Sequence, residues 1–389
     1  MTDAVPVSPR ERIHVIDILR GFALFGVLAA NIKGYSWPAM VYDISVFHAG
    51  TGFLNTAAEV FLILFIRYKS VALLSFLFGL GFYIQMTRTE SRSANFTRIY
   101  LRRSIALLAF GMLHIVLLWW LDVLSYYAIA AFLLLTFRKK SLNSLKRWIV
   151  AFAIVAPVLA VIGTFSGDDE TGLQADFKQS IAIHQHGTYG EILRYRLHEF
   201  GSQALNLGDF LPTISLMMVF MLMGTWAGRT RILHEPDKHV PEIRRAMKWG
   251  LILGAPVTLL QVLVVFGFPN NDFLIGLSDL LYITLGSLLF LTFAGAIVLW
   301  KGHLSSLAPL GRMTLTNYLM QSLICTTIFN GYGLGLYGRV GPAVGLLLTV
   351  AIYTAQIFLS RWWLSKFQFG PMEWLWRAIT YGYPQGRIS

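Results

Sequence analysis

Residues 104–137 form an almost wholly apolar run, with an arginine pair before it at 102–103 and a basic triplet after it at 138–140. About 20 residues at ~1.5 Å each cross a bilayer core of ~30 Å, so the run is long enough to cross a membrane twice. Its only acidic residue, Asp122, lies near the middle, where a helical hairpin would turn. Both basic ends then lie on one side, as the positive-inside rule requires. The run therefore predicts a polytopic membrane protein.

The composition extends this prediction to the whole chain. Hydrophobic residues make up 56% and charged residues 13%, whereas a soluble domain carries about 25% charged residues. We expect an all-α polytopic fold of about ten transmembrane helices, each bounded by charge, Pro, Gly or polar turn residues. The expected spans are 17–36, 68–87, 103–120, 121–137, 148–166, 209–228, 249–268, 275–300, 309–329 and 341–360.

The distribution of positive charge sets the expected orientation. The net charge is +12, and 25 of the 32 Lys and Arg residues fall in segments on the same side as the N-terminus. This asymmetry predicts that both termini lie inside, and it explains the basic charge without a nucleic-acid partner. The first expected span is followed by nine more, so we interpret it as an anchor and not as a cleavable signal peptide.

Cys325 is the only cysteine, which excludes an internal disulfide and a zinc site built on several thiolates. His184 and His186 alternate as metal ligands on an extended segment could, but no acidic partner is fixed beside them. We therefore expect no metal. P-loop, HExxH and GxSxG motifs are absent from the sequence.

Two long connections interrupt the rhythm of short loops. Residues 37–67 are expected outside and end in an amphipathic stretch that is either an interfacial helix or a re-entrant piece. Residues 166–208 are the longest polar stretch and are expected outside with at least one amphipathic helix. We divide the chain there, into a five-helix bundle over 1–165 and a second one over 209–389. The aromatic C-terminal tail is expected to lie on the inner membrane interface.

His114 is the first candidate for chemistry. It lies 11 residues after Arg103, about 16 Å along a helix, at a depth where an ionisable group suggests a functional site. A hairpin turn near 120–121 would place Tyr126 or Tyr127 at its level, with Asp122 nearer the outer surface. A buried neutral imidazole could act as a general base. Alternatively, His114 bonds a tyrosine and locks two helices together.

Asp122 also has two interpretations. A short polar residue at a turn can cap the next helix, or its carboxylate can contact an acceptor or a cation at the outer mouth. Asp17 and Arg20 share a helix face at the inner end of the first span. They form an ion pair that holds the bundle, or Arg20 meets a phosphate.

A basic cluster near the inner surface is suited to the phosphates of a CoA-type cofactor. Its members are Arg98, Arg102 and Arg103, and the plain alternative is positive-inside bias. Further polar residues inside spans either join helices by hydrogen bonds or line a cavity. They are Asn31, Asp279, Asn317 and Gln321, of which the last two are four residues apart and face the same way.

Three segments resemble the YeiB-like family of bacterial inner-membrane proteins. They are RIHVIDILRGFALFGVLAANI near the start, GMLHIVLLWWLDVLSYYAI in the middle, and GRMTLTNYLMQSLICTTIF with FGPMEWLWRAITYG near the end. The first segment also resembles the opening span of transmembrane acyltransferases related to heparan-alpha-glucosaminide N-acetyltransferase. This second resemblance implies an acyl-CoA bound from the cytoplasmic side and a histidine that deprotonates a hydroxyl or amine of a sugar on the far side.

In those acyltransferases the functional histidine follows the first span, where this sequence has only His48, so His48 and His114 both stay open. The leading hypothesis is acyl transfer to a carbohydrate or related lipid-linked acceptor, with His114, Asp122 and Tyr127 at the catalytic centre. Arg20 and the basic cluster would bind the acyl-CoA in a cavity between the first, third, fourth and ninth spans. The alternative is a transporter or channel for a small polar or lipid-like solute. Assembly as a homodimer is left open.

Overall fold

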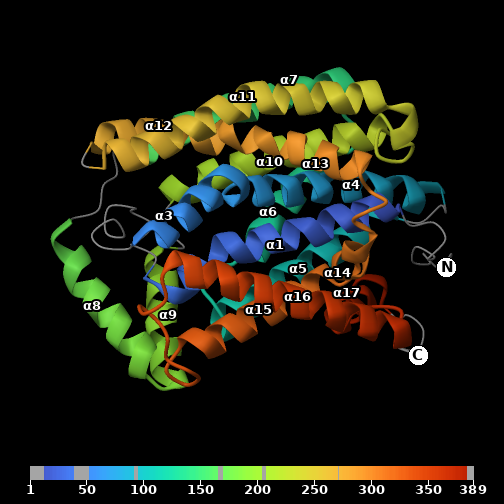
Figure 1. The fold of residues 1–389 in the computed structure, drawn as a ribbon. Coiled ribbons are helices and arrows are strands. Elements are labelled where there is room, and N and C mark those ends of the chain that lie inside the picture. Colours follow the sequence, from blue (N-terminus) through green and yellow to red (C-terminus); the bar gives the residue numbers. More distant parts are fainter. Residues whose placement is uncertain are drawn as a thin grey trace.

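The computed structural model describes residues 13–38, 52–91, 95–164, 170–203, 207–269 and 271–382. His48 lies outside these residues. The described chain consists of helices and short connections and contains no strand, which confirms the predicted all-α fold. The helices lie side by side along one direction, with α8 and α9 across one end and α17 at the other (Figure 1). We refer to these as the α8–α9 end and the α17 end.

The first part of the chain forms α1 (His14–Ser36), α3 (Gly52–Phe61), the π-helical turn η3 (Leu62–Ile66), α4 (Lys69–Ser91), α5 (Phe96–Leu117), α6 (Leu124–Leu135), α7 (Leu142–Thr164), α8 (Glu170–His186) and α9 (Tyr189–Gln203). The remainder forms α10 (Leu207–Arg229), η4 (Pro236–Lys238), α11 (Val240–Gly267), α12 (Asp272–Thr284), η5 (Gly286–Leu289), α13 (Phe290–Leu299), η6 (Ser305–Leu307), α14 (Ala308–Arg312), α15 (Thr314–Phe329), α16 (Pro342–Lys366) and α17 (Pro371–Tyr381).

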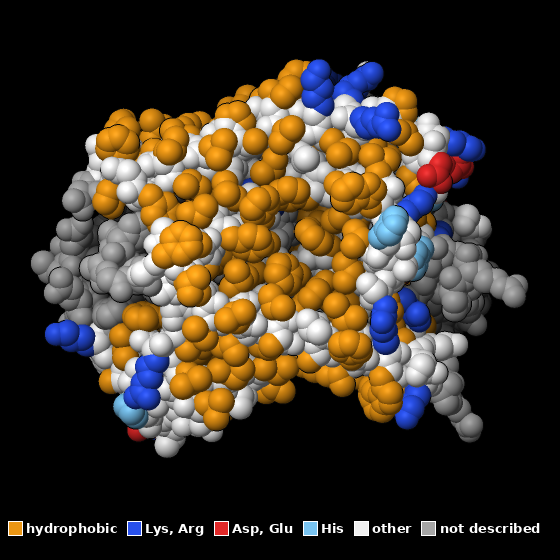
Figure 2. Space-filling model, viewed as in Figure 1, with side chains coloured by type: hydrophobic (Ala, Val, Ile, Leu, Met, Phe, Trp, Pro, Cys, Tyr) orange, Lys and Arg blue, Asp and Glu red, His pale blue; other side chains and the backbone are white. Residues whose placement is uncertain are grey.

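Within the described residues, seven helical segments are long and apolar enough to cross a membrane. The bent pair α12 and η5–α13 makes an eighth if it is counted as one span, and α6 is apolar but only 12 residues long. Hydrophobic side chains cover the middle of the molecule in the view of Figure 2, and charged side chains lie toward its ends. The chain is therefore a multi-pass membrane protein, while the count of ten spans and the orientation stay predictions.

Helix α1 is the centre of the bundle. The most apolar stretch of α1 is 72% buried, whereas that of α7 is 11% buried and faces outward. Helix α1 packs against α4 from the first part of the chain and against α14, α15 and α16 from the second. Helix α10 likewise packs against both α4 and α7. The two predicted five-helix halves are thus divisions along the sequence, and their helices interleave in space.

Glycines allow α4 and α10 to pack closely. A Cβ on Gly79 would overlap the carbonyl oxygen of Met221, and a Cβ on Gly224 would overlap that of Phe76. The hydroxyl of Thr225 also donates a hydrogen bond to the carbonyl of Gly79 (3.2 Å). Small residues that let backbones meet in this way drive helix association in membranes, where burial of apolar surface alone does not.

Two helical rods in the membrane region are interrupted. The rod of α3, η3 and α4 breaks at Arg67 and Tyr68, where Tyr68 has the positive φ of 62°. The stretch expected to be interfacial or re-entrant is therefore helical from Gly52 and leads directly into α4. The second break separates α12 from η5–α13 with a bend of 41°.

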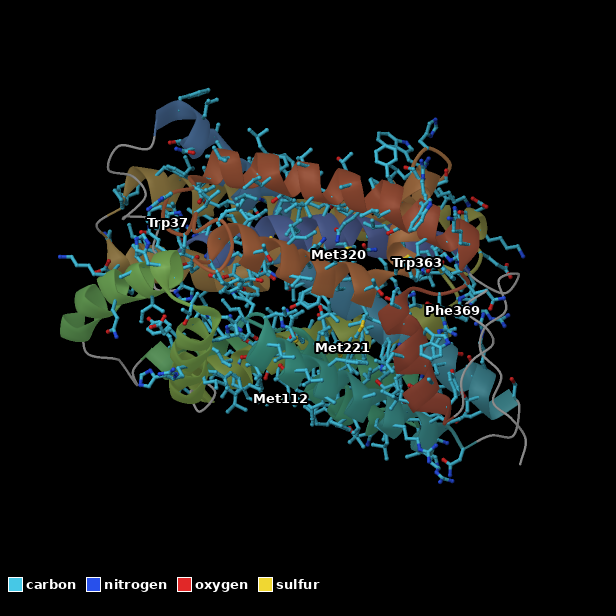
Figure 3. The ribbon with its side chains drawn as sticks, turned by 90° about the horizontal axis from the view of Figure 1, so that it is seen from below. Trp37, Met112, Met221, Met320, Trp363 and Phe369 are labelled. Carbon is cyan, nitrogen blue, oxygen red and sulfur yellow. The ribbon has the colours of Figure 1, made fainter. Side chains whose placement is uncertain are left out.

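The polar segment 170–203 forms two helices that cover one end of the bundle. Trp37 marks this end and Phe369 the opposite one in Figure 3. Tyr189 donates a hydrogen bond to the carbonyl of Leu117 (2.8 Å), and Arg196 donates one to that of Val116 (3.1 Å). The last carbonyls of α5, which no helical N–H can reach, are satisfied in this way. The predicted amphipathic helix is thus a cap on α5.

Gly224→Ala should destabilise the protein, because the new Cβ meets backbone that cannot move aside without separating α4 from α10. Overpacking of this kind costs about 1–3 kcal/mol. Gly276→Ala on α12 is the matched control, since a Cβ there has no other atom within 4 Å. The melting temperature in detergent should fall for Gly224→Ala only. An unchanged value in both variants would contradict the close α4–α10 contact.

Candidate functional site

His114 lies in the last turn of α5, and its side chain is buried. Its Nδ1 atom is 3.0 Å from Oδ1 of Asp122, although the ring N–H does not point straight at that oxygen. The pair forms because Gly111, one turn earlier, lets residues 122–125 lie against α5. A Cβ on Gly111 would come within 2.6 Å of both Asp122 Oδ2 and the backbone nitrogen of Ser125.

The carboxylate of Asp122 is held from more than one side. Its Oδ2 accepts a hydrogen bond of 2.6 Å from the backbone N–H of Ser125, so Asp122 caps the start of α6 as the sequence suggested. The hydroxyl of Tyr318 on α15 donates to Oδ1 across 3.5 Å. The same side chain that caps the helix therefore faces His114, and the two interpretations of Asp122 are compatible.

The other ring nitrogen of His114 contacts a serine on a different helix. Nε2 of His114 is 2.7 Å from Oγ of Ser322 on α15, and this Oγ is 2.6 Å from the hydroxyl of Tyr35 on α1. Asp122, His114, Ser322 and Tyr35 thus form a continuous buried chain that joins α5, α15 and α1. We call these four residues the polar chain.

The prediction that Tyr126 or Tyr127 lies beside His114 is wrong. Tyr127 donates to the carbonyl of Val71 (3.3 Å) and contacts Ser75, while the ring of Tyr126 packs against Phe210. The reason is the hairpin geometry. Helix α5 ends at Leu117 and α6 begins at Leu124, so a six-residue connection replaces the tight turn expected at 120–121 and brings Asp122 to the level of His114.

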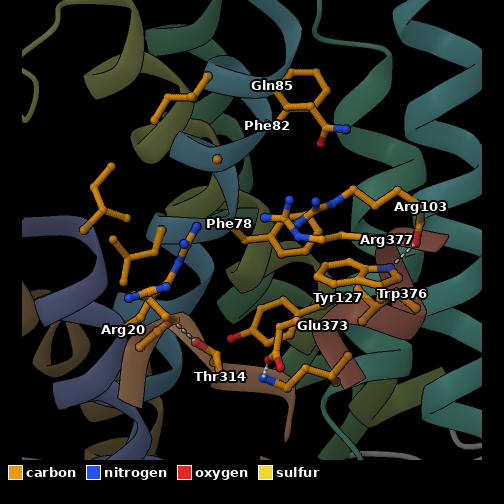
Figure 4. A pocket seen from close by; sticks show the side chains of 18 of the residues that line it. Arg20, Phe78, Phe82, Gln85, Arg103, Tyr127, Thr314, Glu373, Trp376 and Arg377 are labelled. Atoms are coloured by element: carbon orange, nitrogen blue, oxygen red, sulfur yellow. Dashed lines mark hydrogen bonds between the residues drawn. The ribbon is translucent and has the colours of Figure 1, made fainter. Parts of the chain in front are cut away.

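A cavity of about 340 Å³ opens at the α17 end of the bundle. Figure 4 shows its wall, with Phe78 and Tyr127 beside Arg20, Arg103 and Trp376. Side chains from α1, α4, α5, α6, α15 and α17 line it. The predicted cavity between the first, third, fourth and ninth spans is therefore extended by the second span, α4, and by the C-terminal helix.

Positive charge surrounds this cavity. Two of the four predicted phosphate ligands line it, Arg20 and Arg103, whereas Arg98 and Arg102 are exposed on the surface and do not. Arg20 is paired with Asp17, which also lines the cavity, at 3.5 Å. Three further lining arginines were missed by sequence reasoning: Arg88, Arg312 and Arg377. With five arginines against Asp17 and Glu373, the lining favours an anionic ligand.

Helix α17 forms one wall of the cavity. The indole N–H of Trp376 donates to the carbonyl of Arg103 (3.0 Å), and the Arg103 guanidinium lies 3.9 Å from the centre of the Trp376 ring. Glu373 accepts hydrogen bonds from the N–H groups of Leu315 (2.6 Å) and Thr316 (3.1 Å) at the start of α15. Burial raises the pKa of Glu373, and the hydrogen bonds from Thr316 and Leu315 oppose that rise.

The cavity ends against the polar chain. Tyr318 lines its inner end, and the Tyr318 ring is 5.2 Å from that of His114, centre to centre. Val123, the neighbour of Asp122, lines the same end. One wall of side chains therefore separates a cationic, partly apolar cavity from an imidazole, a carboxylate and a hydroxyl.

Asn317 and Gln321 join helices and do not line this cavity. The Asn317 amide donates to Oγ of Ser360 on α16 (3.0 Å), and the amides of Gln321 and Gln356 meet at 2.9 Å. Asp279 accepts a hydrogen bond of 2.8 Å from Gln261 on α11. Neither Asp279 nor Asn31 is among the residues that line the cavity.

A second cavity, of about 20 Å³, lies at the α8–α9 end. Tyr35 lines it, stacked on Trp119 with 3.9 Å between ring centres. His184 of α8 and Arg196 of α9 line it as well. His184 donates from Nδ1 to the carbonyl of Ser180 (2.8 Å) and stacks on Tyr337.

Among the described residues, no group of three His, Cys, Asp or Glu side chains is arranged to hold a metal.

Protonation of His184 should weaken the α8–α9 end. Burial lowers the pKa of His184 to about 4, the bond to Ser180 opposes this, and the charge of Arg196 adds to it. An unfolded histidine has a pKa of about 6.5, so the unfolded state binds more protons between pH 6.5 and 4 and stability falls as the pH decreases. From pH 7 to pH 5 this amounts to about 2 kcal/mol.

His184→Gln should remove that part of the acid destabilisation, because glutamine does not titrate. Melting temperatures at pH 7 and pH 5 measure it, and His303→Gln, at an exposed position, is the control. Equal acid sensitivity of the native protein and His184→Gln would contradict the burial of a neutral imidazole.

Similar proteins cover the chain from end to end. Residues 227–383 match the model of a family described as "Protein of unknown function (DUF418)". The chain is 36% identical to the uncharacterized protein YxaH of Bacillus subtilis, over 98% of this chain and 97% of YxaH. It is 27% identical to the uncharacterized protein YeiB of Escherichia coli, over 95% of this chain and 96% of YeiB.

Proposed function

The chain belongs to the YeiB-like DUF418 family of membrane proteins, and we propose that it transfers an acyl group from an acyl-CoA-type substrate to a carbohydrate or lipid-linked acceptor. The observation that carries this proposal is the cavity that ends at the polar chain. Its five arginines suit a phosphorylated group, and its apolar depth suits the arm and acyl chain of a thioester. His114 lies directly behind Tyr318, which lines the inner end of this cavity, and the reactive end of such a molecule would reach it once that ring turns aside.

The length of the site supports a long, two-ended substrate. Arg103 and His114 lie 11 residues apart on α5, which corresponds to about 16 Å along the helix. A ligand that reaches both must carry its negative charge at one end and its reactive carbon at the other. A nucleotide joined to a thioester through a flexible arm has this shape, and the volume of about 340 Å³ is within the range of small-molecule sites.

His114 is the proposed general base. Its Nδ1 faces the Asp122 carboxylate, which favours the tautomer with a proton on Nδ1 and leaves Nε2 free to accept one. The carboxylate also stabilises the imidazolium that forms when Nε2 takes a proton. Tyr127 lines the cavity but makes its hydrogen bonds to α4, so its proposed role is confined to shaping the wall.

The acceptor is proposed to approach from the α8–α9 end. The stacked pair Tyr35 and Trp119 borders the second cavity, and Tyr35 is directly bonded to Ser322. Aromatic faces next to hydrogen-bonding groups are suited to a sugar ring. The cavity of about 20 Å³ has room for about one water molecule, so α8 and α9 would have to move for a sugar to enter. The polar chain would then separate a donor site at one end of the bundle from an acceptor site at the other.

Two adjacent arginines on α5 test the proposed acyl-CoA site. Arg103→Gln should weaken binding by about 1–3 kcal/mol, the scale of a charge-assisted contact. Arg102→Gln should have little effect, because Arg102 is exposed and does not line the cavity. Calorimetry with the purified protein and acetyl-CoA measures both affinities, and the melting temperature of each variant without ligand controls for misfolding.

Equal affinity of the two variants, or an absence of binding to the native protein, would contradict the donor site. Sidedness is tested in sealed vesicles, since acetyl-CoA does not cross a membrane. Consumption of the thioester should occur in inverted membrane vesicles and be absent from right-side-out spheroplasts if the α17 end faces the cytoplasm.

One observation favours transport as a second candidate function. The two interrupted rods lie against each other, because Tyr282 of α12 donates to the carbonyl of Ile63 in η3 (2.6 Å). Lys69 is buried at the same place and donates to that carbonyl and to the Tyr282 hydroxyl. Interrupted helices in contact are typical of transporter sites. Uptake of a solute into proteoliposomes, lost in Lys69→Met, would support this candidate over acyl transfer.

A further inference from the structure

We infer that Ser322 carries the acyl group as a covalent ester, so that transfer proceeds in two steps through an acylated enzyme. This inference rests on the proposed function. Three contacts define the arrangement: Asp122 Oδ1 to His114 Nδ1 (3.0 Å), His114 Nε2 to Ser322 Oγ (2.7 Å), and Ser322 Oγ to the Tyr35 hydroxyl (2.6 Å). Carboxylate, imidazole and hydroxyl in this order form the constellation that activates a serine, on whatever fold it occurs.

The proton positions follow from the partners. Asp122 accepts from the backbone of Ser125 and lies 3.0 Å from Nδ1 of His114, so the carboxylate favours the tautomer with its proton on Nδ1 and not on Nε2. In that tautomer Ser322 donates its hydroxyl proton to Nε2 (2.7 Å) in preference to the more distant carbonyl of Tyr318 (3.4 Å), and Tyr35 donates to the Ser322 oxygen. The lone pairs of Ser322 Oγ are thereby oriented, and Tyr35 is a positioning residue. A serine that only joined helices would need neither the histidine nor the carboxylate behind it.

Helix α15 offers a comparison within the same element. Asn317 and Gln321 project from α15 and bond amides or hydroxyls of α16, which is how uncharged polar residues hold membrane helices together. Ser322 follows Gln321 directly, but its side chain contacts His114 and Tyr35 and not α16. This side chain is fully buried. The helix thus separates its structural polar residues from its one residue with an activating base.

The chemistry balances without any further reactant. In the first step Ser322 Oγ attacks the thioester carbonyl carbon, His114 Nε2 takes the serine proton, and the C–S bond breaks. The CoA thiolate leaves with the proton from His114. In the second step His114 takes a proton from the acceptor hydroxyl, whose oxygen attacks the ester carbon, and the proton returns to Ser322 Oγ as the ester bond breaks.

The order of the two cavities agrees with this sequence of steps. Tyr318, which lines the large cavity, is one turn before Ser322 on α15, and Tyr35, which lines the small cavity, is bonded to Ser322. The serine therefore lies between the proposed sites of the two substrates. The thioester reaches it once the Tyr318 ring turns aside, and the bond of Tyr318 to Asp122 is a long one, at 3.5 Å. An acyl-serine lets the two substrates react without meeting.

The test is the formation of an acyl-protein when no acceptor is present. Purified protein is mixed with [14C]acetyl-CoA and quenched in acid, and the label is counted and mapped by mass spectrometry of peptides. We expect a burst of free CoA of one equivalent at most and one acetyl group on the peptide that contains Ser322. Ser322→Ala should lose the label and at least ~100-fold in transfer while it still binds acetyl-CoA.

Two further variants keep the result interpretable. Ser360→Ala removes another buried serine of the same bundle, one bonded to Asn317 and not to a histidine, and should retain labelling. Ser322→Cys keeps the size and a nucleophilic atom, so label on the introduced thiol, as a thioester, would support the assignment even if Ser322→Ala failed to fold.

The outcomes separate this inference from the proposed function. Acetyl-CoA that binds and supports transfer with no acyl-protein, and with Ser322→Ala still active, would show direct transfer and overturn the covalent step alone. Label on a residue other than Ser322 would overturn it as well. Absence of acetyl-CoA binding to the native protein would overturn the proposed function itself.

Discussion

The close approach of residues 122–125 to α5 at Gly111 is the contact on which the rest of the site depends. Only a residue without a Cβ leaves room there for the Asp122 carboxylate and the Ser125 backbone. An unpaired carboxylate in an apolar bundle costs several kcal/mol, so the approach is stable only because Asp122 finds Ser125 and His114 at once. With His114 fixed in this way, its second nitrogen selects Ser322 and thereby aligns α15 with α5.

Amphipathic segments close the bundle at each end, and each has consequences for the site. At the α8–α9 end, Tyr189 and Arg196 donate hydrogen bonds to the last carbonyls of α5, two and three residues after His114. At the α17 end, Trp376 and Glu373 attach the C-terminal helix to α5 and α15 and complete the wall of the cavity. The non-helical connection 118–123 between α5 and α6 has no exposed residue.

Hydropathy and charge were enough to predict the membrane class and the all-α fold. They also drew attention to His114 and Asp122, because an ionisable group within an apolar run can be recognised from the sequence alone. The partner of His114 was not predictable in this way. The level of Asp122 depends on where α5 ends, and the contact with Ser322 joins positions 208 residues apart. The exposed Arg102 and the cavity-lining Arg103 are neighbours in sequence, and only helix packing distinguishes them. The sequence GMLH places Gly111 one turn before His114, and this spacing was the available signal that another segment packs closely against α5 there.

The central claim is that the arginine-lined cavity and the polar chain are one acyl-transfer site. A structure with a bound acetyl-CoA analogue whose thioester sulfur is replaced by a methylene tests it most directly. We expect phosphate density beside Arg103 and Arg377 and the carbonyl carbon within reach of Ser322 Oγ, with the Tyr318 ring displaced. Ligand density elsewhere, or a ligand in the cavity whose carbonyl points away from an undisturbed Tyr318, would contradict it.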